Sequence, residues 1–474
     1  MVRFNETKTG DTMKKIAIVG GGISGLTAAY ILASRNPDLD VTVFESDRRA
    51  GGKIWTEKVE GFLCEKGPNG FLDNKPKTLE LCNSLGIDPV RSNENSKKRF
   101  IFSEGRLKAL PESPLSFMKS DLLSWGGKFR LIGELIASKG PDNETVADFI
   151  TRRLGKETLD KLIDPMCSGI YAGDPATMSI KSCFPRIKEL EQEYGSLIKA
   201  MIKIKKQRKA ERARQKSKEE VKVSAAPGGT LTSFYNGAQV ITDALANNLG
   251  KHLNVGVSVR GITKHNGTYQ LDTSNGTFDA DIVIIATPAY ATAGMLTDLD
   301  KELSKTLADI PYPHVSVVCF GYRKEQVVHS LNGFGFLVPH MEKRKILGTL
   351  WDSSVFPNRA SEGHVLLRTM IGGAKAPEMA AFDDDKIMSA VFDELKPVMG
   401  LTSDPEMVRI YRWDKAIPQY LLGHSRILGT IEENLAHYPG LYLTGNAYRG
   451  IGINDCIENS YRIADEILAK IQDA

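Results

Sequence analysis

Near its start, the chain changes from a continuous apolar run to a helical spacing of apolar residues and then back to an apolar run. The segment KIAIVG at residues 15–20 is apolar after its lysine and shows no alternation, which predicts a strand buried on both faces of a sheet. The segment ISGLTAAYILAS, from Ile23, has helical spacing, and VTVFE at 41–45 predicts a second strand. The pattern therefore predicts a β-α-β unit.

Glycines occupy the turn between the first predicted strand and the helix. Gly20, Gly22 and Gly25 follow the spacing G-x-G-x-x-G, which allows a tight turn, a close approach of the backbone to a diphosphate and close packing of the helix. Glu45 lies twenty residues after Gly25, at the end of the second strand, where a carboxylate can hold ribose hydroxyls. We expect a dinucleotide site here; the alternative is a glycine-rich turn with a purely structural role.

Three later segments extend this unit. The doublet Gly51-Gly52 brings a second backbone segment towards the diphosphate, a common addition in flavoproteins of the amine oxidase type, and it favours FAD over NAD. Residues 256–262 and 279–289 predict strands that return to the nucleotide domain, and residues 440–468 predict a strand, a glycine-rich turn and a helix. The C-terminal turn can place backbone N–H groups against the flavin ring system.

The predicted fold is α/β, with a Rossmann-like dinucleotide-binding domain assembled from discontinuous segments. We expect this domain to contain residues 14–90, 223–300 and 411–474. Residues 91–222 form a mainly helical insertion that could face a membrane, and residues 301–410 form part of a mixed α+β substrate-binding domain.

Charge is unevenly distributed along the chain. The net charge is +4, yet residues 199–222 hold eleven Lys or Arg residues and only three Glu residues. Such a run is usually a solvated helix or loop; an alternative is attraction to anionic lipid. The run has no interleaved aromatic residues, so we expect no binding to nucleic acid.

Cysteine, histidine and hydropathy patterns narrow the class of protein. The six cysteines form no C-x-x-C pair and the eight histidines show no ligand spacing, so we expect reduced thiols and no metal site. The start of the chain lacks the apolar core of a signal peptide, and no apolar run approaches the roughly 18 residues of a spanning helix. We expect a cytoplasmic protein, with peripheral contact to the inner face of the cell membrane as an open possibility.

Several longer stretches carry a family resemblance over nearly the whole chain. Residues 164–197 (DPMCSGIYAGDPATMSIKSCFPRIKELEQEYGSL) resemble the protoporphyrinogen and coproporphyrinogen oxidase family, flavoenzymes of the amine oxidase superfamily. Five further stretches resemble the same family: GPNGFL at 67–72, GFGFLVP at 333–339, SSVFPNRA at 353–360, RWDKAIPQY at 412–420 and GIGINDCIENS at 450–460.

The resemblance implies that a porphyrinogen is oxidised to a porphyrin in haem biosynthesis. This is a six-electron reaction in three flavin cycles, with molecular oxygen or another acceptor reoxidising a noncovalent FAD and oxygen yielding hydrogen peroxide. No catalytic side chain is expected, because the flavin accepts the hydride. A homodimer is also possible on this resemblance.

The resemblance also assigns residues to the two ligands. It places FAD against Gly20, Gly21, Gly22, Ile23, Ser24, Gly25, Glu45, Ser46, Gly52, Lys53, Gly67, Pro68, Asn69, Gly70, Val259, Trp413, Ile451, Gly452 and Ile453. It places the tetrapyrrole against Phe334, Leu337, Leu350 and Met370, with Arg99 holding a propionate carboxylate. The alternatives are core packing for Trp413 and the four apolar residues, and a plain surface arginine for Arg99. Cys456 is expected to pack without attachment to the flavin.

Arg99 bears on the choice of substrate. Family members acting on coproporphyrinogen III lack an arginine there, so its presence favours protoporphyrinogen IX. Coproporphyrinogen III remains the alternative, because other basic residues such as Arg186 or Arg449 could hold its carboxylates. More distant alternatives are an amine oxidase, a carotenoid desaturase or a flavin-binding protein without catalytic activity.

Overall fold

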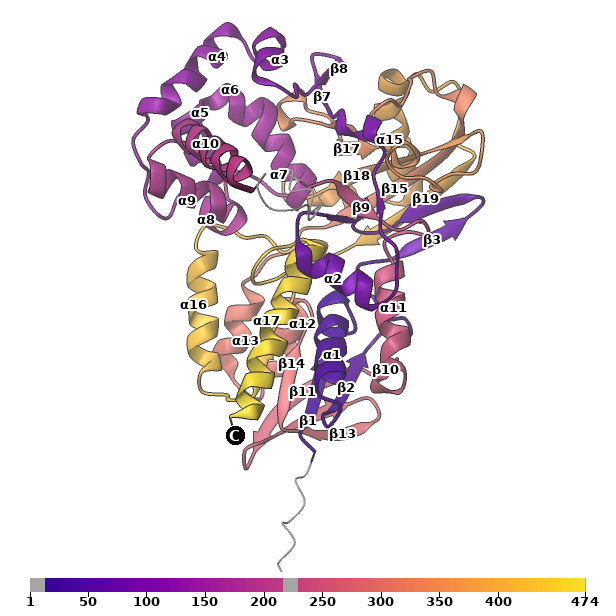
Figure 1. Ribbon diagram of the computed structural model, residues 1–474. Helices are drawn as coiled ribbons and strands as arrows, with labels where there is room; N and C mark the ends of the chain where they lie inside the picture. Colours follow the sequence, from indigo (N-terminus) through magenta and orange to yellow (C-terminus); the bar gives the residue numbers. More distant parts are fainter. Residues whose placement is uncertain (1–12, 216–228, 474) are drawn as a thin grey trace, which may run out of the picture.

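A five-stranded parallel sheet contains the predicted β-α-β unit (Figure 1). The computed structural model describes residues 13–215 and 229–473. The strand order is β10-β2-β1-β14-β20, and the strands are β1 (Lys15–Val19), β2 (Asp40–Glu45), β10 (Leu253–Val255), β14 (Ile282–Ile285) and β20 (Leu441–Leu443). Strands from three distant parts of the chain therefore meet in one sheet.

Helices cover both faces of this sheet, which explains why its central strands are apolar throughout. Ile16 and Ile18 pack on one face with the helices α1 (Ile23–Arg35), α2 (Pro76–Ser84), α11 (Val240–Leu249) and α17 (Ile453–Gln472). Ala17 and Val19 pack on the other face with α12 (Ala289–Leu296), α13 (Lys301–Ala308) and α16 (His424–Leu435). The predicted α/β class is confirmed.

A small antiparallel sheet completes the second face. It contains β11 (Val259–His265), β12 (Thr268–Thr273) and β13 (Gly276–Ala280). The predicted strand at 256–262 corresponds to β11, so it lies in this sheet and not in the parallel one. The predicted strand at 279–289 is shorter in the structure, where it is β14.

A seven-stranded mixed sheet lies above the parallel sheet in Figure 1. Its order is β19-β15-β18-β17-β16-β7-β8, and the strands are β19 (Met407–Trp413), β15 (Val315–Arg323), β18 (His364–Gly372), β17 (Ile346–Leu350), β16 (Gly335–Leu337), β7 (Phe100–Ser103) and β8 (Arg106–Ala109). Helix α15 (Asp384–Met399) packs on one face through Ile387 and Leu395. Strands β7 and β8 come from the segment expected to be mainly helical; the domain boundaries given above stay a prediction.

Short strands and short helices lie outside the two large sheets and the small antiparallel sheet. They are β3 (Thr56–Val59), β4 (Phe62–Glu65), β5 (Phe71–Leu72), β6 (Val90–Arg91), β9 (Leu231–Ser233) and the short helix α14 (Asp352–Val355), with the single-turn helices η1 (Glu94–Lys97), η4 (Gly250–His252), η5 (Lys324–Gln326), η6 (His340–Glu342) and η7 (Pro377–Ala381). The loop after β4, residues 67–70, is called the 67–70 loop below.

The remaining helices form a separate layer beside the seven-stranded sheet (Figure 1). They are α3 (Pro114–Lys119), α4 (Trp125–Ile132), η2 (Gly133–Ile136), α5 (Val146–Leu154), α6 (Lys156–Thr158), η3 (Leu159–Ile163), α7 (Asp164–Tyr171), α8 (Ile180–Cys183), α9 (Pro185–Tyr194) and α10 (Leu197–Gln215). The basic run begins in α10; residues 216–222 of the run lie outside the described residues. Within the described ranges, no helix combines the length and apolar character needed to cross a bilayer.

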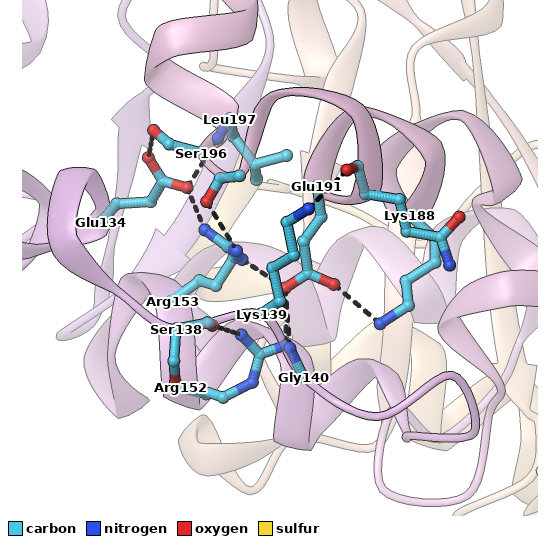
Figure 2. A network of polar contacts seen from close by, with 12 residues as sticks. Glu134, Ser138, Lys139, Gly140, Arg152, Arg153, Lys188, Glu191, Ser196 and Leu197 are labelled. Carbon is cyan, nitrogen blue, oxygen red and sulfur yellow. Dashed lines mark hydrogen bonds and ion pairs between the residues drawn. The ribbon is translucent and has the colours of Figure 1, made fainter.

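A buried ionic network joins these helices (Figure 2). Arg153 donates to Glu134 at 2.6 Å and to Glu191 at 2.7 Å, and all three side chains are fully buried. Lys188 donates to Glu191 at 2.7 Å. Burial alone would raise the pKa of Glu191, but hydrogen bonds from Lys188, Arg153 and Arg152 lower it to about 2. The network therefore connects η2, α5 and α9 through ion pairs between their charged side chains.

Candidate functional site

The turn between β1 and α1 requires glycine at two positions, Gly25 for lack of space and Gly20 for its backbone conformation. A Cβ atom on Gly25 would lie 1.9 Å from the carbonyl oxygen of Gly20, and Gly20 itself has a φ of +107°. A Cβ on Gly22 would meet nothing closer than the Cα of Gly52 at 4.0 Å. The turn thus packs tightly on its inner side and leaves open space at Gly22.

Glu45 is tied to this turn. Its carboxylate accepts hydrogen bonds from the N–H of Gly21 at 2.7 Å and from the N–H of Asp47 at 2.8 Å, and Ser46 Oγ lies 3.2 Å from the same carboxylate. The Glu45 carbonyl accepts from Val257 at 2.9 Å, which brings the start of β11, and so Val259, next to the end of β2. The carboxylate expected to hold a ribose also fixes the shape of the turn.

The glycine doublet lies against the same turn. Gly51 donates its N–H to the carbonyl of Gly21 at 2.7 Å, and Gly52 has a φ of +55° with the Cα of Gly22 beside it. The next residue, Lys53, carries its ammonium inward to the carbonyls of Lys415 and Ala416. Burial lowers the pKa of Lys53 to about 8. Within the described ranges, no carboxylate forms an ion pair with this ammonium.

The 67–70 loop packs between the doublet and β9. A Cβ on Gly67 would lie 2.1 Å from the carbonyl oxygen of Lys53, and one on Gly70 would lie 2.2 Å from that of Thr232. Asn69 is buried; its Nδ2 donates to Asp352 at 3.2 Å, while its Oδ1 is buried without a partner in the described structure. Gly67 and Gly70 therefore let the loop backbone approach its neighbours closely on both sides of Pro68 and Asn69.

The C-terminal glycine turn brings a second helix start to the same edge of the parallel sheet. Strands β1 and β20 both run parallel to β14, so the helices that follow them begin at the same edge. Gly452 is the N-cap of α17, and Ser460 of α17 donates to the carbonyl of Ser24 in α1 at 2.8 Å. The start of α17 therefore lies at the same edge of the parallel sheet as the first glycine turn. Cys456 is buried in this contact, and burial raises its pKa to about 11.

Trp413 joins the seven-stranded sheet to this region. Its indole Nε1 donates to the carbonyl of Lys66 at 2.8 Å, and its ring lies 5.9 Å from the ammonium of Lys53. The side chain is only partly buried. The structure thus brings together the glycine turns, the doublet, the 67–70 loop and Trp413, whereas their roles as cofactor contacts stay predictions.

The four apolar residues expected around a macrocycle are all partly buried, unlike core residues. Strand pairing puts Met370 opposite Gly348, and Gly348 opposite Leu337, while Leu350 pairs with Arg368. Paired residues in adjacent strands share a face, so Leu337, Leu350 and Met370 lie on one face of the sheet. A Cβ on Gly169 of α7 would lie 2.8 Å from Leu337 Cδ2, which places α7 against this face.

Arg99 stands at the edge of this region. Its guanidinium lies 5.2 Å from the centre of the Phe334 ring, and the side chain is exposed. The backbone N–H of Phe334 donates to Lys98 at 2.8 Å, which keeps the two segments adjacent. The cation and the aromatic ring predicted for the substrate therefore lie side by side.

Comparison with known proteins identifies the family. The sequence model of the family described as flavin containing amine oxidoreductase matches residues 23–468. The chain belongs to the flavin-containing amine oxidoreductase family. It is therefore an oxidoreductase, and its cofactor is FAD.

Relatives of this flavin-containing oxidoreductase cover nearly the whole chain. Protoporphyrinogen oxidase 1 of Arabidopsis thaliana chloroplasts is 33% identical over 470 residues, 95% of this chain and 87% of the relative. Coproporphyrinogen III oxidase of Bacillus subtilis is 31% identical over 475 residues, 97% of this chain and 98% of the relative. A solved structure from Exiguobacterium sp. 255-15, provisionally assigned as a protoporphyrinogen oxidase, has a TM-score of 0.82 and 27% identity and covers 97% of this chain and 100% of its own.

The residues of the site fit the flavin dinucleotide. The N-terminus of α1 has no capping side chain, the space at Gly22 is open, and the Lys53 ammonium donates to two backbone carbonyls without a carboxylate partner in the described ranges. A diphosphate supplies the negative charge that a helix N-terminus and a lysine favour. Asn69 Oδ1 is a buried acceptor available to a ligand N–H.

Sequence reasoning missed two residues of the oxidoreductase that lie under this site. Arg368 donates to Asp352 at 2.7 Å and to the carbonyl of Gly67 at 2.9 Å, and both side chains are buried. No sequence motif signals this pair, because Asp352, which follows β17, meets Arg368 of β18 only when these two strands pair. The stretch at 353–360 that carries the family resemblance begins directly after Asp352.

Proposed function

We propose that this oxidoreductase converts protoporphyrinogen IX to protoporphyrin IX, using oxygen as the acceptor and releasing hydrogen peroxide. The observation that carries the proposal is the apolar face of Leu337, Leu350 and Met370, with Arg99 beside Phe334 at its edge. A flat tetrapyrrole with propionate side chains has the complementary chemistry. The names of the relatives, which are porphyrinogen oxidases, support the same class of reaction.

The residues of the chain bind and orient the reactants. FAD, when bound, supplies the acceptor for each two-electron step. The apolar side chains press on the ring faces and exclude water, and the guanidinium of Arg99 offers paired N–H donors to a propionate. The glycine turns, the 67–70 loop and Trp413 hold the dinucleotide. In this division, the segments expected to form the nucleotide domain hold FAD, and the seven-stranded sheet holds the substrate.

Coproporphyrinogen III is the second candidate substrate. The B. subtilis relative named for that activity matches this chain over almost its whole length. Coproporphyrinogen III carries more carboxylates, so its binding would depend on further cations. We favour protoporphyrinogen IX because Arg99 stands at the position where, by the family resemblance, the members that act on coproporphyrinogen III lack an arginine.

Initial rates of porphyrin fluorescence in air, measured with each porphyrinogen, test the assignment. We expect a higher rate with protoporphyrinogen IX, and at least a tenfold rise in KM for it in Arg99→Leu. The neighbouring exposed cation serves as the control: Lys98→Leu also removes one positive charge, but it keeps the backbone carbonyl through which Lys98 contacts Phe334 and the Arg99 guanidinium beside the ring. A higher rate with coproporphyrinogen III assigns the chain to that reaction. Peroxide formation with amines, and none with either porphyrinogen, would refute both assignments.

We also propose that the helical layer contacts an anionic bilayer surface. Large apolar side chains are exposed along α3, α4 and η2: Leu115, Met118, Trp125, Phe129, Ile132 and Ile136. Ile136 is 89% exposed and Phe129 is 66% exposed. Helix α10 adds the exposed cations Lys203, Lys205 and Lys206. Apolar insertion next to basic charge is the combination that binds anionic lipid.

Sedimentation with vesicles tests this contact. Phe129→Ser combined with Ile136→Ser should lower binding to vesicles of mixed neutral and anionic lipid at least fivefold. Val328→Ser removes an apolar residue that is 74% exposed on a different part of the surface, so it should leave binding unchanged. Equal binding of both variants would rule out the proposed surface.

A homodimer, which we propose from the family resemblance, is tested by light scattering.

A further inference from the structure

A cluster of buried charged and polar side chains lies between the 67–70 loop and the seven-stranded sheet. It contains Glu65, Asn69, Asp352, Arg359 and Arg368, and each side chain is at most 8% exposed. Apart from Asn69, none of these residues has a place in the proposed binding of FAD or porphyrinogen.

Asp352 uses its two carboxylate oxygens in two different parts of the fold. Oδ2 accepts from Arg368 Nε at 2.7 Å, and Oδ1 accepts from Asn69 Nδ2 at 3.2 Å. Arg368 lies in β18, and a second of its nitrogens donates to the carbonyl of Gly67 at 2.9 Å. The Asp352–Arg368 pair therefore connects a strand of the seven-stranded sheet to two residues of the 67–70 loop, Gly67 and Asn69.

The pair also decides which way the Asn69 amide faces. Because Asp352 is an acceptor, it takes the Nδ2 donor of Asn69 and turns Oδ1 away. Oδ1 is then buried without a partner in the described residues. A buried acceptor without a donor is unfavourable, so this orientation points to a donor brought by a ligand.

The location of the pair identifies the chemistry of that donor. Arg368 pairs with Leu350, and Met370 follows two residues later on the same face. On its other side the 67–70 loop packs against the carbonyl of Lys53, the residue that follows the glycine doublet. Of the ligands expected here, two carry ring N–H groups that could supply the donor: the flavin, through its imide, and the porphyrinogen, through its pyrroles.

We propose that Arg368 and Asp352 are positioning residues that fix Asn69 so that its Oδ1 accepts a ring N–H from a bound ligand. The inference rests on the proposed function for the porphyrinogen source, and only on the FAD cofactor for the flavin source. A buried ion pair is by itself weak evidence for stability, and here its hydrogen bonds supply a fixed orientation instead.

The test compares Asn69→Leu, Asp352→Asn and the double variant, each loaded with FAD. If the flavin is the donor, both single variants should weaken FAD binding at least tenfold and shift the flavin absorbance bands without substrate present. If the porphyrinogen is the donor, FAD binding should be unchanged while KM rises at least tenfold. In either case the double variant should match Asn69→Leu alone, because Asp352 acts through Asn69.

A second buried ion pair controls for general damage. Glu134→Gln breaks the pair with Arg153 in the helical layer, so it should lower thermal stability without changing FAD binding, the flavin spectrum or KM. If Asp352→Asn does not fold, Arg368→Lys keeps the charge opposite Asp352 but loses a donor, and it should show the same changes.

Two results would overturn the proposal. The first is that Asp352→Asn, or Arg368→Lys in its place, changes FAD affinity, the flavin spectrum and KM no more than Glu134→Gln does. The other is additive losses in the double variant, which would mean that the pair and Asn69 act separately. If the wild-type protein oxidises no porphyrinogen, the proposed function fails, but the FAD affinity and spectrum still decide the flavin source.

Discussion

Gly25 shows how one missing side chain controls the nucleotide turn. Because a Cβ there would lie 1.9 Å from the carbonyl oxygen of Gly20, Gly25→Ala must move the turn or the helix. We expect a loss of about 1–3 kcal/mol in unfolding free energy and at least tenfold weaker FAD binding, measured by denaturation and by flavin fluorescence.

The control is a glycine with free space around it. Gly294 lies in helix α12, and a Cβ there would meet nothing within 4 Å. Gly294→Ala should stabilise the protein by about 0.5–1 kcal/mol and leave FAD binding unchanged. Similar losses in both variants would contradict the role given to Gly25.

His424 makes the stability depend on pH. It is buried, its ring stacks on Tyr420 with centres 4.3 Å apart, and burial lowers its pKa from 6.5 to about 4. The unfolded chain therefore binds the proton first as pH falls from 6.5 towards 4. Stability from this residue is fully present above 6.5 and is lost over that range, by up to about 1.4 kcal/mol per pH unit.

Denaturation at pH 7 and pH 5 measures this effect. The fall in unfolding free energy between the two values should be smaller by about 2 kcal/mol in His424→Gln than in the wild type. The exposed His437 provides the matched control, and His437→Gln should keep the wild-type dependence. An unchanged dependence in His424→Gln would refute the assignment.

At the scale of the element, Glu134 holds the start of the basic helix α10. Its carboxylate accepts from the N–H of Leu197 at 2.6 Å, from the N–H of Ile198 at 3.1 Å and from Ser196 Oγ at 2.6 Å. Burial alone would raise the pKa of Glu134, but these hydrogen bonds lower it. A carboxylate at a helix N-terminus is also favoured by the helix dipole. One residue of η2 thus positions α10 beside the exposed apolar helices.

Hydrogen exchange tests the capping role. In Glu134→Gln, one oxygen acceptor becomes a donor, so the first turn of α10 should exchange its amide protons at least tenfold faster than in the wild type. The comparison is Glu189→Gln, which removes only an exposed pair with Arg186 and should leave this turn unchanged. Equal exchange in both variants would show that Glu134 does not cap the helix.

At the scale of the whole molecule, FAD should stabilise the contact between the two large sheets. The glycine turns belong to the parallel sheet, and Trp413 and the 67–70 loop connect to the other. Removal of FAD should lower the unfolding free energy by about 2.7 kcal/mol relative to a FAD concentration one hundred times the dissociation constant.

Thermal denaturation over a range of FAD concentrations measures this coupling. Amide exchange should rise at the start of α1 and α17 and in the 67–70 loop when FAD is removed, while helices α5 and α9 keep their protection. A melting temperature independent of FAD concentration would contradict the proposed cofactor contacts.

Much of the fold was predictable because its signals are local. The apolar run that follows Lys15 and the helical spacing after Ile23 are patterns of neighbouring residues, so both can be read from the sequence. The strand at 256–262 was predicted, but not its place in a separate antiparallel sheet. Strands β7 and β8 were hidden in a segment read as helical, because each has only four residues.

The candidate site divides in the same way. The glycine residues were recognisable because their spacing indicates a tight backbone turn. Arg99 and Trp413 were recognisable only by resemblance to the family. The Asp352–Arg368 pair, the second use of the Glu45 carboxylate and the exposed surface of α3, α4 and η2 carried no sequence signal. Each depends on contacts between segments that are distant along the chain.

The sequence by itself determined the β-α-β unit, the dinucleotide turn and the excess of positive charge at 199–222, because periodicity, glycine conformations and charge are properties of short segments. Only the tertiary structure decided that β10, β14 and β20 join the first two strands in one sheet. It also decided that Asn69 donates its Nδ2 to Asp352 and leaves its Oδ1 without a partner in the described residues, because that orientation depends on a carboxylate 283 residues away.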